Sequence, residues 1–101
     1  MPAYEVGFPS AAIEKSFEKE LSRLDRGVLL KIKEAVNSLG DNPRPQGKKI
    51  KALRPPLRVS LFLAQYRIRV ADFRVLYDID DTAHKVILLA IRRRSEKTYR
   101  E

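Results

Sequence analysis

The chain has 101 residues, which is enough for one small folded domain. Of these residues 44% are hydrophobic and 34% are charged, a composition too apolar for a disordered protein. It contains no cysteine, so disulfide bonds and thiolate metal ligands are excluded. Its formal net charge of +8 favours nucleic acid as a partner over an acidic protein or an anionic membrane.

The positive charge is concentrated in the second half of the chain. Residues 1–42 carry six Lys and Arg against seven Asp and Glu, whereas residues 43–101 carry fifteen against six. A near-neutral half joined to a basic half is typical of a protein that binds a polyanion. The chain does not begin like a signal peptide, and its longest apolar run, Val86 to Ile91, is too short to cross a bilayer. We therefore expect one domain over residues 1–101, located in the cytoplasm.

The first 42 residues predict a strand followed by two antiparallel helices. The strand is expected from Ala3 to Phe8, and Ser10 is placed to cap the first helix. Asp25 is placed to cap the second helix, and Gly40 to end it. Apolar residues at helical spacing predict the two inward faces, which are Ile13, Phe17, Leu21 and Leu24, and then Val28, Leu29, Ile32, Val36 and Leu39.

Residues 40–56 predict a basic loop, because four prolines and two glycines among them prevent long regular structure. Its candidate phosphate-binding residues are Lys48, Lys49, Lys51 and Arg54. A solvated loop without a binding role is the alternative interpretation. Between Leu57 and Val70 the apolar face changes parity near Ala64 and Gln65. This pattern predicts either one long strand with a bulge or break, or a separate strand or apolar loop before residue 65.

Residues 66–77 predict a β-hairpin with a two-residue turn at Ala71 and Asp72. The expected pairs are Tyr66 with Tyr77, Arg67 with Leu76, Ile68 with Val75, Arg69 with Arg74, and Val70 with Phe73. One face would then be wholly apolar, and the other would carry three arginines and no acid. Like charges that face each other across strands destabilise a sheet. The three arginines therefore favour a site for an anion over a merely solvated face.

The remaining residues predict an acidic turn, a buried strand and a basic tail. The turn spans residues 78–84, and we interpret it as solvated, with His84 exposed and not catalytic. The strand Val86 to Ile91 is apolar on both parities, as in the middle of a sheet covered on both sides. If it neighbours the hairpin, the tail residues that follow add to the same cationic site. These are Arg92, Arg93 and Arg94, with Tyr99 available for base stacking.

The order of these elements, the hairpin sequence YRIRVADFRVLYDIDD and the tail RRRSEKTYR resemble the RelE/ParE superfamily of toxins from toxin–antitoxin modules. The resemblance covers nearly the whole chain. It implies an α+β fold in which an N-terminal strand and a helical hairpin pack on a small antiparallel sheet. RelE-type members cleave mRNA in the ribosomal A site without a metal or other cofactor. The 2′-hydroxyl of the RNA attacks the adjacent phosphate and leaves a cyclic phosphate.

The resemblance assigns catalytic roles to Arg67, Arg69, Arg74, Arg93 and Tyr99. Arg67 and Arg69 would lie near the nucleophile and the phosphate, and Arg74 would stabilise the phosphate. Arg93 would serve the leaving group, although the three consecutive arginines leave open whether Arg92 or Arg94 takes this position. We count Arg92 and Arg94, together with the basic loop residues, as phosphate contacts. Tyr99 would stack on a base and orient or deprotonate the hydroxyl.

The sequence departs from the family pattern at three places. Arg67 and Arg69 stand where lysines can occur, and because arginine is a poor base, proton transfer would fall on Tyr99. Ala71 stands where a glycine is usual, which strains the turn if its φ angle must be positive. The stretch from Arg58 to Gln65 is an addition before the hairpin.

The leading hypothesis from the sequence is a ribosome-dependent mRNA endonuclease. The alternatives are a ParE-like inhibitor of DNA gyrase and a non-catalytic nucleic-acid-binding protein of the same fold. All three predict a cognate antitoxin as a partner, and the endonuclease also predicts contacts with the ribosome and mRNA.

Overall fold

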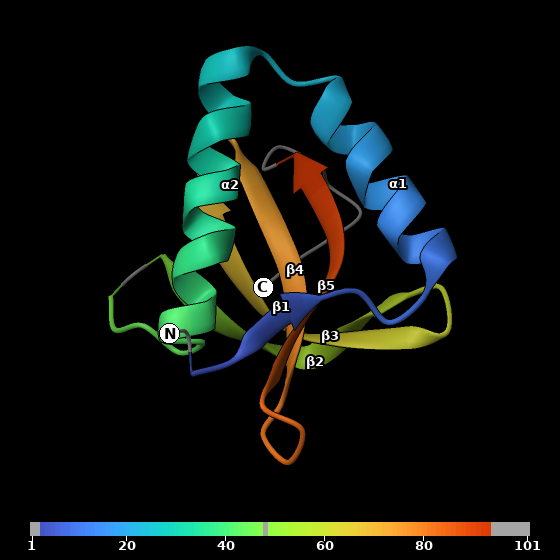
Figure 1. Cartoon of the computed structure of the whole chain (residues 1–101), viewed down its shortest axis with the longest axis vertical. Coiled ribbons are helices and arrows are strands. Elements are labelled where there is room, and N and C mark those ends of the chain that lie inside the picture. The colour runs from blue at the N-terminus through green and yellow to red at the C-terminus, as the bar shows by residue number, and fades with distance from the viewer. Residues whose placement is uncertain (1–2, 48, 94–101) are drawn as a thin grey trace.

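The computed structural model of the chain describes residues 3–47 and 49–93 (Figure 1). Within these ranges, two helices and five strands follow in the order β1, α1, α2, β2, β3, β4, β5. The strands form one sheet with the spatial order β1-β5-β4-β3-β2, in which β1 is parallel to β5 and the other pairs are antiparallel. Both helices lie on the same face of the sheet (Figure 1). The predicted α+β class is confirmed.

The two helices begin at the predicted capping residues. The Ser10 side chain accepts a hydrogen bond from the Ile13 N–H at the start of α1 (Ala11–Ser22), and Asp25 accepts one from the Val28 N–H at the start of α2 (Arg26–Asp41). The predicted end of α2 at Gly40 is wrong. Gly40 is buried inside the last turn, where its carbonyl accepts a hydrogen bond of 2.8 Å from the Tyr4 N–H. α2 thus ends at Asp41, one residue beyond the predicted stop, and the N-terminal segment supplies a donor to one of the carbonyls of its last turn.

The hairpin of β3 (Phe62–Val70) and β4 (Phe73–Asp80) has the predicted register at all five pairs, from Tyr66 with Tyr77 to Val70 with Phe73. Ala71 in the turn has a φ of 55°, so the strain expected of a residue other than glycine is present. The alternation of apolar and cationic residues was therefore sufficient to fix which side chains share a face.

The main core lies between the helices and the sheet. β5 (Lys85–Arg93) runs between β4 and β1 (Glu5–Gly7), as predicted for a central strand. The buried residues of this core are Phe17, Ile32, Val36, Leu39, Ile68, Val70, Val75, Tyr77, Val86, Leu88 and Ile91. No helix in the described part of the chain is long and apolar enough to cross a membrane.

The predicted loop over residues 40–56 is only partly correct, because β2 (Ile50–Val59) begins at Ile50 and continues through Pro55 and Pro56. β2 is an edge strand, where a proline is tolerated because its missing N–H is needed by no neighbour. The pairing with β3 is irregular between Ala52 and Leu57. This irregularity lies opposite Gln65, where the parity change had predicted a bulge or a break.

The far end of the β2–β3 hairpin covers part of the sheet face that the helices leave open. A second buried cluster consists of Ile13, Leu53, Val59, Ala64, Leu76, Leu89 and Ala90. Leu76 alternates with Val75 and Tyr77 of the main core, so the cluster includes the opposite face of β4. The alternative of a single long strand from Leu57 to Val70 is wrong, because a turn at Ser60 and Leu61 separates β2 from β3 and pairs Val59 with Phe62.

Candidate nucleic-acid interface

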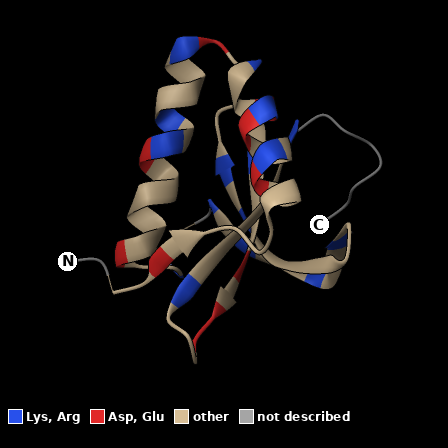
Figure 2. Cartoon of the chain, turned by 45° about the vertical axis from the view of Figure 1, so that its right-hand side comes forward, with Lys and Arg blue, Asp and Glu red and all other residues tan. Residues whose placement is uncertain are grey.

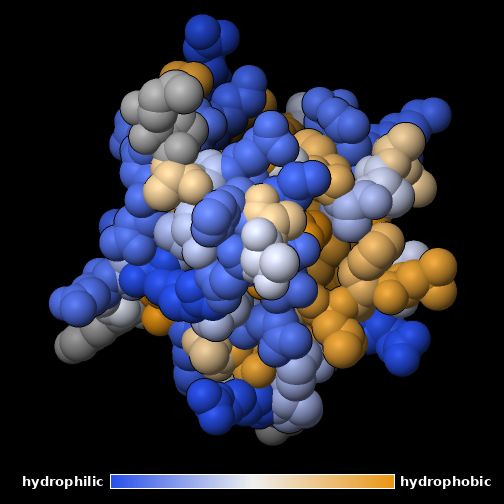
Figure 3. Space-filling model, turned by 60° about the horizontal axis from the view of Figure 1, so that its bottom comes forward, coloured by the Kyte–Doolittle hydropathy of each residue, from blue (hydrophilic) through white to orange (hydrophobic). Residues whose placement is uncertain are grey.

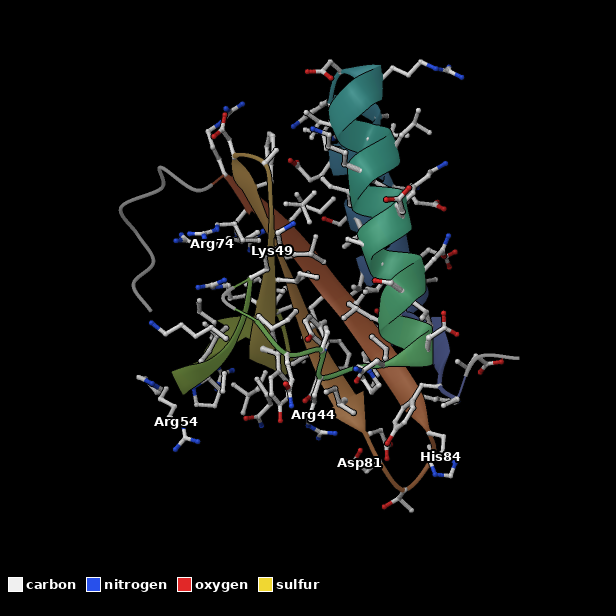
Figure 4. All side chains as sticks on the ribbon, turned by 90° about the vertical axis from the view of Figure 1, so that its left-hand side faces the viewer. Arg44, Lys49, Arg54, Arg74, Asp81 and His84 are labelled. Carbon is white, nitrogen blue, oxygen red and sulfur yellow. The ribbon has the colours of Figure 1, made fainter. Side chains whose placement is uncertain are left out.

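Three arginines from adjacent strands form a row on the sheet face away from the helices. Arg69 of β3 is paired with Arg74 of β4, and Arg74 is paired with Arg92 of β5. Directly paired residues share a face, and strands lie about 4.8 Å apart, so this arginine row is roughly 10 Å long at its backbone. Arg74 points away from α2 (Figure 4). The fold therefore brings the hairpin and the beginning of the basic tail together.

The arginine row is a local concentration of positive charge that does not serve the core. Arg69 and Arg74 are half-buried, and Arg92 is exposed. The ion pairs found between described residues are Arg23–Glu20 and Arg44–Asp81, so no described carboxylate forms an ion pair with Arg69 or Arg92. Each pair of facing like charges destabilises a sheet by about 0.2–1 kcal/mol. An anionic ligand between these facing cations would offset their repulsion, which favours a binding role for the row over a packing role.

Arg67 lies on the same face but has a different environment. It is only 6% exposed, and its guanidinium donates a hydrogen bond of 2.6 Å to the Lys49 carbonyl. The Arg69 N–H donates to the same carbonyl at 2.9 Å. Arg67 therefore holds the end of the basic loop against β3. Because the Arg69 N–H binds the same carbonyl, the buried Arg67 helps to fix the backbone at Arg69, a member of the arginine row.

Arg93 lies on the other side of the sheet from the arginine row. It is paired with Phe73, whose ring belongs to the helix-facing surface, and its guanidinium lies 5.0 Å from the centre of that ring. A small cleft of about 360 Å³ there is also lined by Glu20 of α1, by its C-cap residue Arg23 and by the neighbouring Arg92. Of the two tail arginines that the structure describes, Arg92 joins the row and Arg93 does not.

The end of the loop before β2, together with β2 itself, brings further basic residues toward the same part of the molecule. Lys49, Lys51 and Arg54 are exposed, and Lys51 is paired with Arg67. Arg54 lies on the same side of the sheet as Arg74 (Figure 4). The predicted site residues Lys48, Arg94 and Tyr99 lie outside the described residues.

An ion pair that the sequence did not predict fixes the other end of this loop. The Arg44 guanidinium donates to both carboxylate oxygens of Asp81, at 3.1 and 2.9 Å, and its Nε donates to the Tyr66 hydroxyl. The Tyr4 hydroxyl donates to Asp81 at 2.6 Å. The hydrogen bond from Arg44, followed by that from Tyr4, lowers the pKa of Asp81 to about 2. This contact joins residues 37 positions apart, and nothing in the local sequence marks Arg44 among the other basic residues.

Tyr77 holds the middle of the same connection. Its hydroxyl is buried and donates a hydrogen bond of 2.9 Å to the Pro43 carbonyl, and its ring stacks on Tyr66. Burial raises the pKa of Tyr77 above its ordinary value. The Arg44 and Tyr77 contacts together determine where the loop leaves α2 and, through it, where Lys49 meets the arginine row.

The arginine row can stabilise negative charge but cannot act as a base, because arginine remains protonated at physiological pH. His84, with a φ of 54°, is exposed and packs edge-on against Tyr4, near Asp81 and far from Arg74 (Figure 4). Across the residues that the structure describes, no group of three or more His, Cys, Asp or Glu side chains is placed to hold a metal ion.

The sequence was compared with protein families. The family described as "ParE toxin of type II toxin-antitoxin system, parDE" matches residues 11–98. A comparison with curated protein sequences gives no match.

Solved structures of RelE proteins have a similar fold. RelE in the RelE–RelB complex of Pyrococcus horikoshii OT3 is similar with a TM-score of 0.72 and 22% identity, over 93% of this chain and 98% of that chain. The RelBE2 toxin–antitoxin complex of Mycobacterium tuberculosis gives a TM-score of 0.62 and 27% identity, over 93% and 100%. A mutant of the E. coli toxin RelE in the free state gives 0.60 and 18%, over 95% and 88%.

Proposed function

The chain belongs to the ParE toxin family of type II toxin–antitoxin systems, and from its arginine row and its similarity to RelE structures we propose that it is a toxin that cleaves mRNA on the ribosome. The arginine row is the observation that carries this proposal, because it offers three cations from three strands on one face. The cognate antitoxin is its protein partner, as RelB is for the RelE proteins of the similar complexes.

The proposed reaction is a transesterification within the RNA. The 2′-oxygen attacks the adjacent phosphorus, the bond from phosphorus to the 5′-oxygen breaks, and a cyclic phosphate and a 5′-hydroxyl result. Negative charge on the phosphate oxygens rises in the transition state, so guanidinium groups held in place beforehand lower the barrier. Arg69 and Arg74 would contact the non-bridging oxygens, and Arg92 would lie nearest the leaving oxygen.

Proton transfer needs a group other than the arginine row. The 2′-hydroxyl must lose a proton, and the leaving 5′-oxygen must gain one. Tyr99 is the proposed residue for orienting the hydroxyl, and in its phenolate form, after giving its own proton to water, it would receive the proton of the 2′-hydroxyl. A water molecule would supply the proton that the leaving 5′-oxygen gains. In this proposal Arg67 positions Arg69 through the Lys49 carbonyl and does not contact the RNA.

Two neighbouring arginines on opposite faces provide a matched test. The toxin would be induced in bacteria, and new mRNA 5′ ends would be mapped on translating ribosomes. We expect Arg92→Gln to reduce cleavage by about 10²–10³-fold, the size typical of losing one donor to a developing oxyanion. Arg93→Gln should remain within a few-fold of the wild type, because Arg93 packs on Phe73 across the sheet. Equal losses in both variants would contradict the proposed site.

Inhibition of DNA gyrase is the second candidate, because the matching family carries the name of the ParE toxins. Gyrase inhibition needs no catalytic residue. Induction of the chain would then activate the DNA-damage response and leave mRNA intact. The same induction experiment therefore separates the two functions.

A further inference from the structure

The β2–β3 hairpin exposes two leucines that neither core contains. Leu61 is 87% exposed at the turn, and Leu63 is 47% exposed on β3. Leu63 is paired with Arg58, so these two side chains share the outward face, whereas Val59 and Ala64 are buried inward. Figure 3 shows a hydrophobic area on the right-hand side of the molecule, the side on which the hairpin lies in Figure 1.

Neither the backbone conformation of the turn nor packing requires a leucine at position 61. Ser60 has a φ of 57°, a conformation that glycine, asparagine and aspartate adopt most readily in two-residue hairpins. Leu61 follows it and is almost fully solvated, so it contributes little to folding. Several apolar groups gathered on a protruding element and bordered by charges are typical of a binding surface.

The charged residues of the β2–β3 hairpin and of the segment before it are all basic. No Asp or Glu occurs between Asp41 and Asp72, and Figure 2 shows blue segments and no red ones on the β2–β3 hairpin. The basic residues of this stretch are Arg44, Lys48, Lys49, Lys51, Arg54, Arg58, Arg67 and Arg69. A complementary partner must therefore carry both apolar side chains and carboxylates. Nucleic acid would satisfy the arginines but offer little to two aliphatic side chains.

The geometry of β2 favours one mode of binding over another. β2 is an edge strand, which could in principle accept an added strand from a partner. Pro55 and Pro56 lack the N–H groups that such a strand would need, and the register is broken between Ala52 and Leu57. The other mode of binding is contact with the outward side chains of the hairpin. An amphipathic helix suits this mode, because it presents apolar and acidic residues side by side on its surface.

We propose that the outward face of the hairpin, formed by Arg54, Arg58, Leu61 and Leu63, binds an acidic amphipathic helix of the cognate antitoxin. The inference rests on the proposed role of the antitoxin as partner. The leucines would pack against the apolar stripe of the helix, and the arginines would pair with carboxylates on either side of it. The addition from Arg58 to Gln65 would then serve recognition of the antitoxin and not cleavage.

The first test compares two exposed apolar sites. The purified toxin would be titrated with the antitoxin encoded in the same operon, by isothermal titration calorimetry. Leu61→Ser combined with Leu63→Ser should weaken binding by about 10–100-fold, as expected when central apolar contacts of an interface are lost. Leu30→Ser on α2, where the leucine is 52% exposed, is the matched control and should bind within about twofold of the wild type. Affinity unchanged in the hairpin variant would overturn the proposal.

A second test addresses the charges. Arg58→Glu should weaken binding more than Lys33→Glu on α2, and the difference should shrink as salt is added, because exposed charges are screened. Equal effects of the two reversals would contradict a specific role for Arg58.

Further readouts distinguish other occupants. Loss of ribosome binding with intact antitoxin affinity in the hairpin variant would assign the surface to RNA. A wild-type dimer in ultracentrifugation that the variant abolishes would assign it to a second copy of the chain. Either result would overturn the proposal. If the wild type leaves mRNA intact, the cleavage mechanism fails, and the titration still decides the antitoxin surface.

Discussion

The arginine row should oppose folding, and its removal should make the protein more stable and less active. The perturbation is the double substitution Arg69→Gln and Arg92→Gln, which leaves Arg74 between two neutral neighbours and removes both facing pairs of like charge. Each pair destabilises a sheet by about 0.2–1 kcal/mol, so the free energy of unfolding should rise by about 0.4–2 kcal/mol. For a chain of this size the melting temperature should rise by roughly 2–16 °C.

Salt dependence identifies the cause of the gain. The Debye length, beyond which charges are largely screened from each other, is about 30 Å at 0.01 M salt and about 3 Å at 1 M, whereas adjacent strands are about 4.8 Å apart. The gain should therefore be largest at low ionic strength and nearly absent at 1 M NaCl. Urea unfolding followed by circular dichroism at both salt concentrations measures it, since urea adds no ions. The same variant should no longer cleave mRNA.

A control must remove the same net charge elsewhere. Lys33→Gln combined with Arg54→Gln removes two exposed cations that do not face another cation across the sheet. This control should change the stability much less than the row variant at low salt. A row variant that is destabilised, or stabilised equally at both salt concentrations, would refute repulsion within the row and with it the argument for a bound anion.

Three further substitutions test the contacts that support the site. Asp81→Asn should lower stability near neutral pH and flatten the acid dependence. The carboxylate has a folded pKa of about 2, below its ordinary 3.8, so its contribution is complete above about pH 4 and is lost as the pH falls toward 2. Thermal melts from pH 2 to 6, with Asp72→Asn as a control, would show this. Tyr77→Phe leaves the buried Pro43 carbonyl without its donor and should cost about 1–3 kcal/mol in chemical denaturation, an effect that a well-placed water would abolish. Ala71→Gly should stabilise the protein by about 0.5–1 kcal/mol by relieving a φ of 55°, and a lower melting temperature would contradict strain at the turn.

The parts of the fold that sequence reasoning predicted correctly depend on neighbours in the chain. The capping roles of Ser10 and Asp25 involve donors three residues ahead. The register of the β3–β4 hairpin follows from a two-residue turn and from alternation on either side of it. In each of these cases the residues that determine the cap or the register are close to each other in the sequence.

The errors occurred where a distant contact decides the outcome. α2 runs one residue past Gly40, and the Gly40 carbonyl in its last turn binds the N–H of Tyr4, which is distant in the sequence. Pro55 and Pro56 read as loop residues, yet they lie in a strand because β2 is at the edge of the sheet. The position of a strand within a sheet is a property of the whole fold, so the local sequence could not supply it.

The candidate site was predictable to the same extent and for the same reason. Arg69 and Arg74 could be placed opposite each other because they belong to one hairpin. The choice between Arg92 and Arg93 required the register of β5 on β4, which contains an irregularity between Leu76 and Tyr77. A shift of one residue moves an arginine to the other face of the sheet. The sequence therefore identified a cationic tail but could not say which of its arginines joins the row.

Fold and candidate site occupy alternate positions of the same strands, and this has a consequence for the chemistry. In the β3–β4 hairpin the even residues from Tyr66 to Val70 face the main core, and Arg67 and Arg69 face the other way. The core thus fixes the backbone beneath the arginine row, and no member of the row belongs to either buried cluster. A cationic group held by a rigid strand needs no rearrangement when an anion arrives, which is the condition under which electrostatic stabilisation of a transition state is most effective. The same closely spaced cations that repel one another in the free protein would attract a phosphate. A mutation that weakens the repulsion within the row should therefore also weaken its affinity for a phosphate.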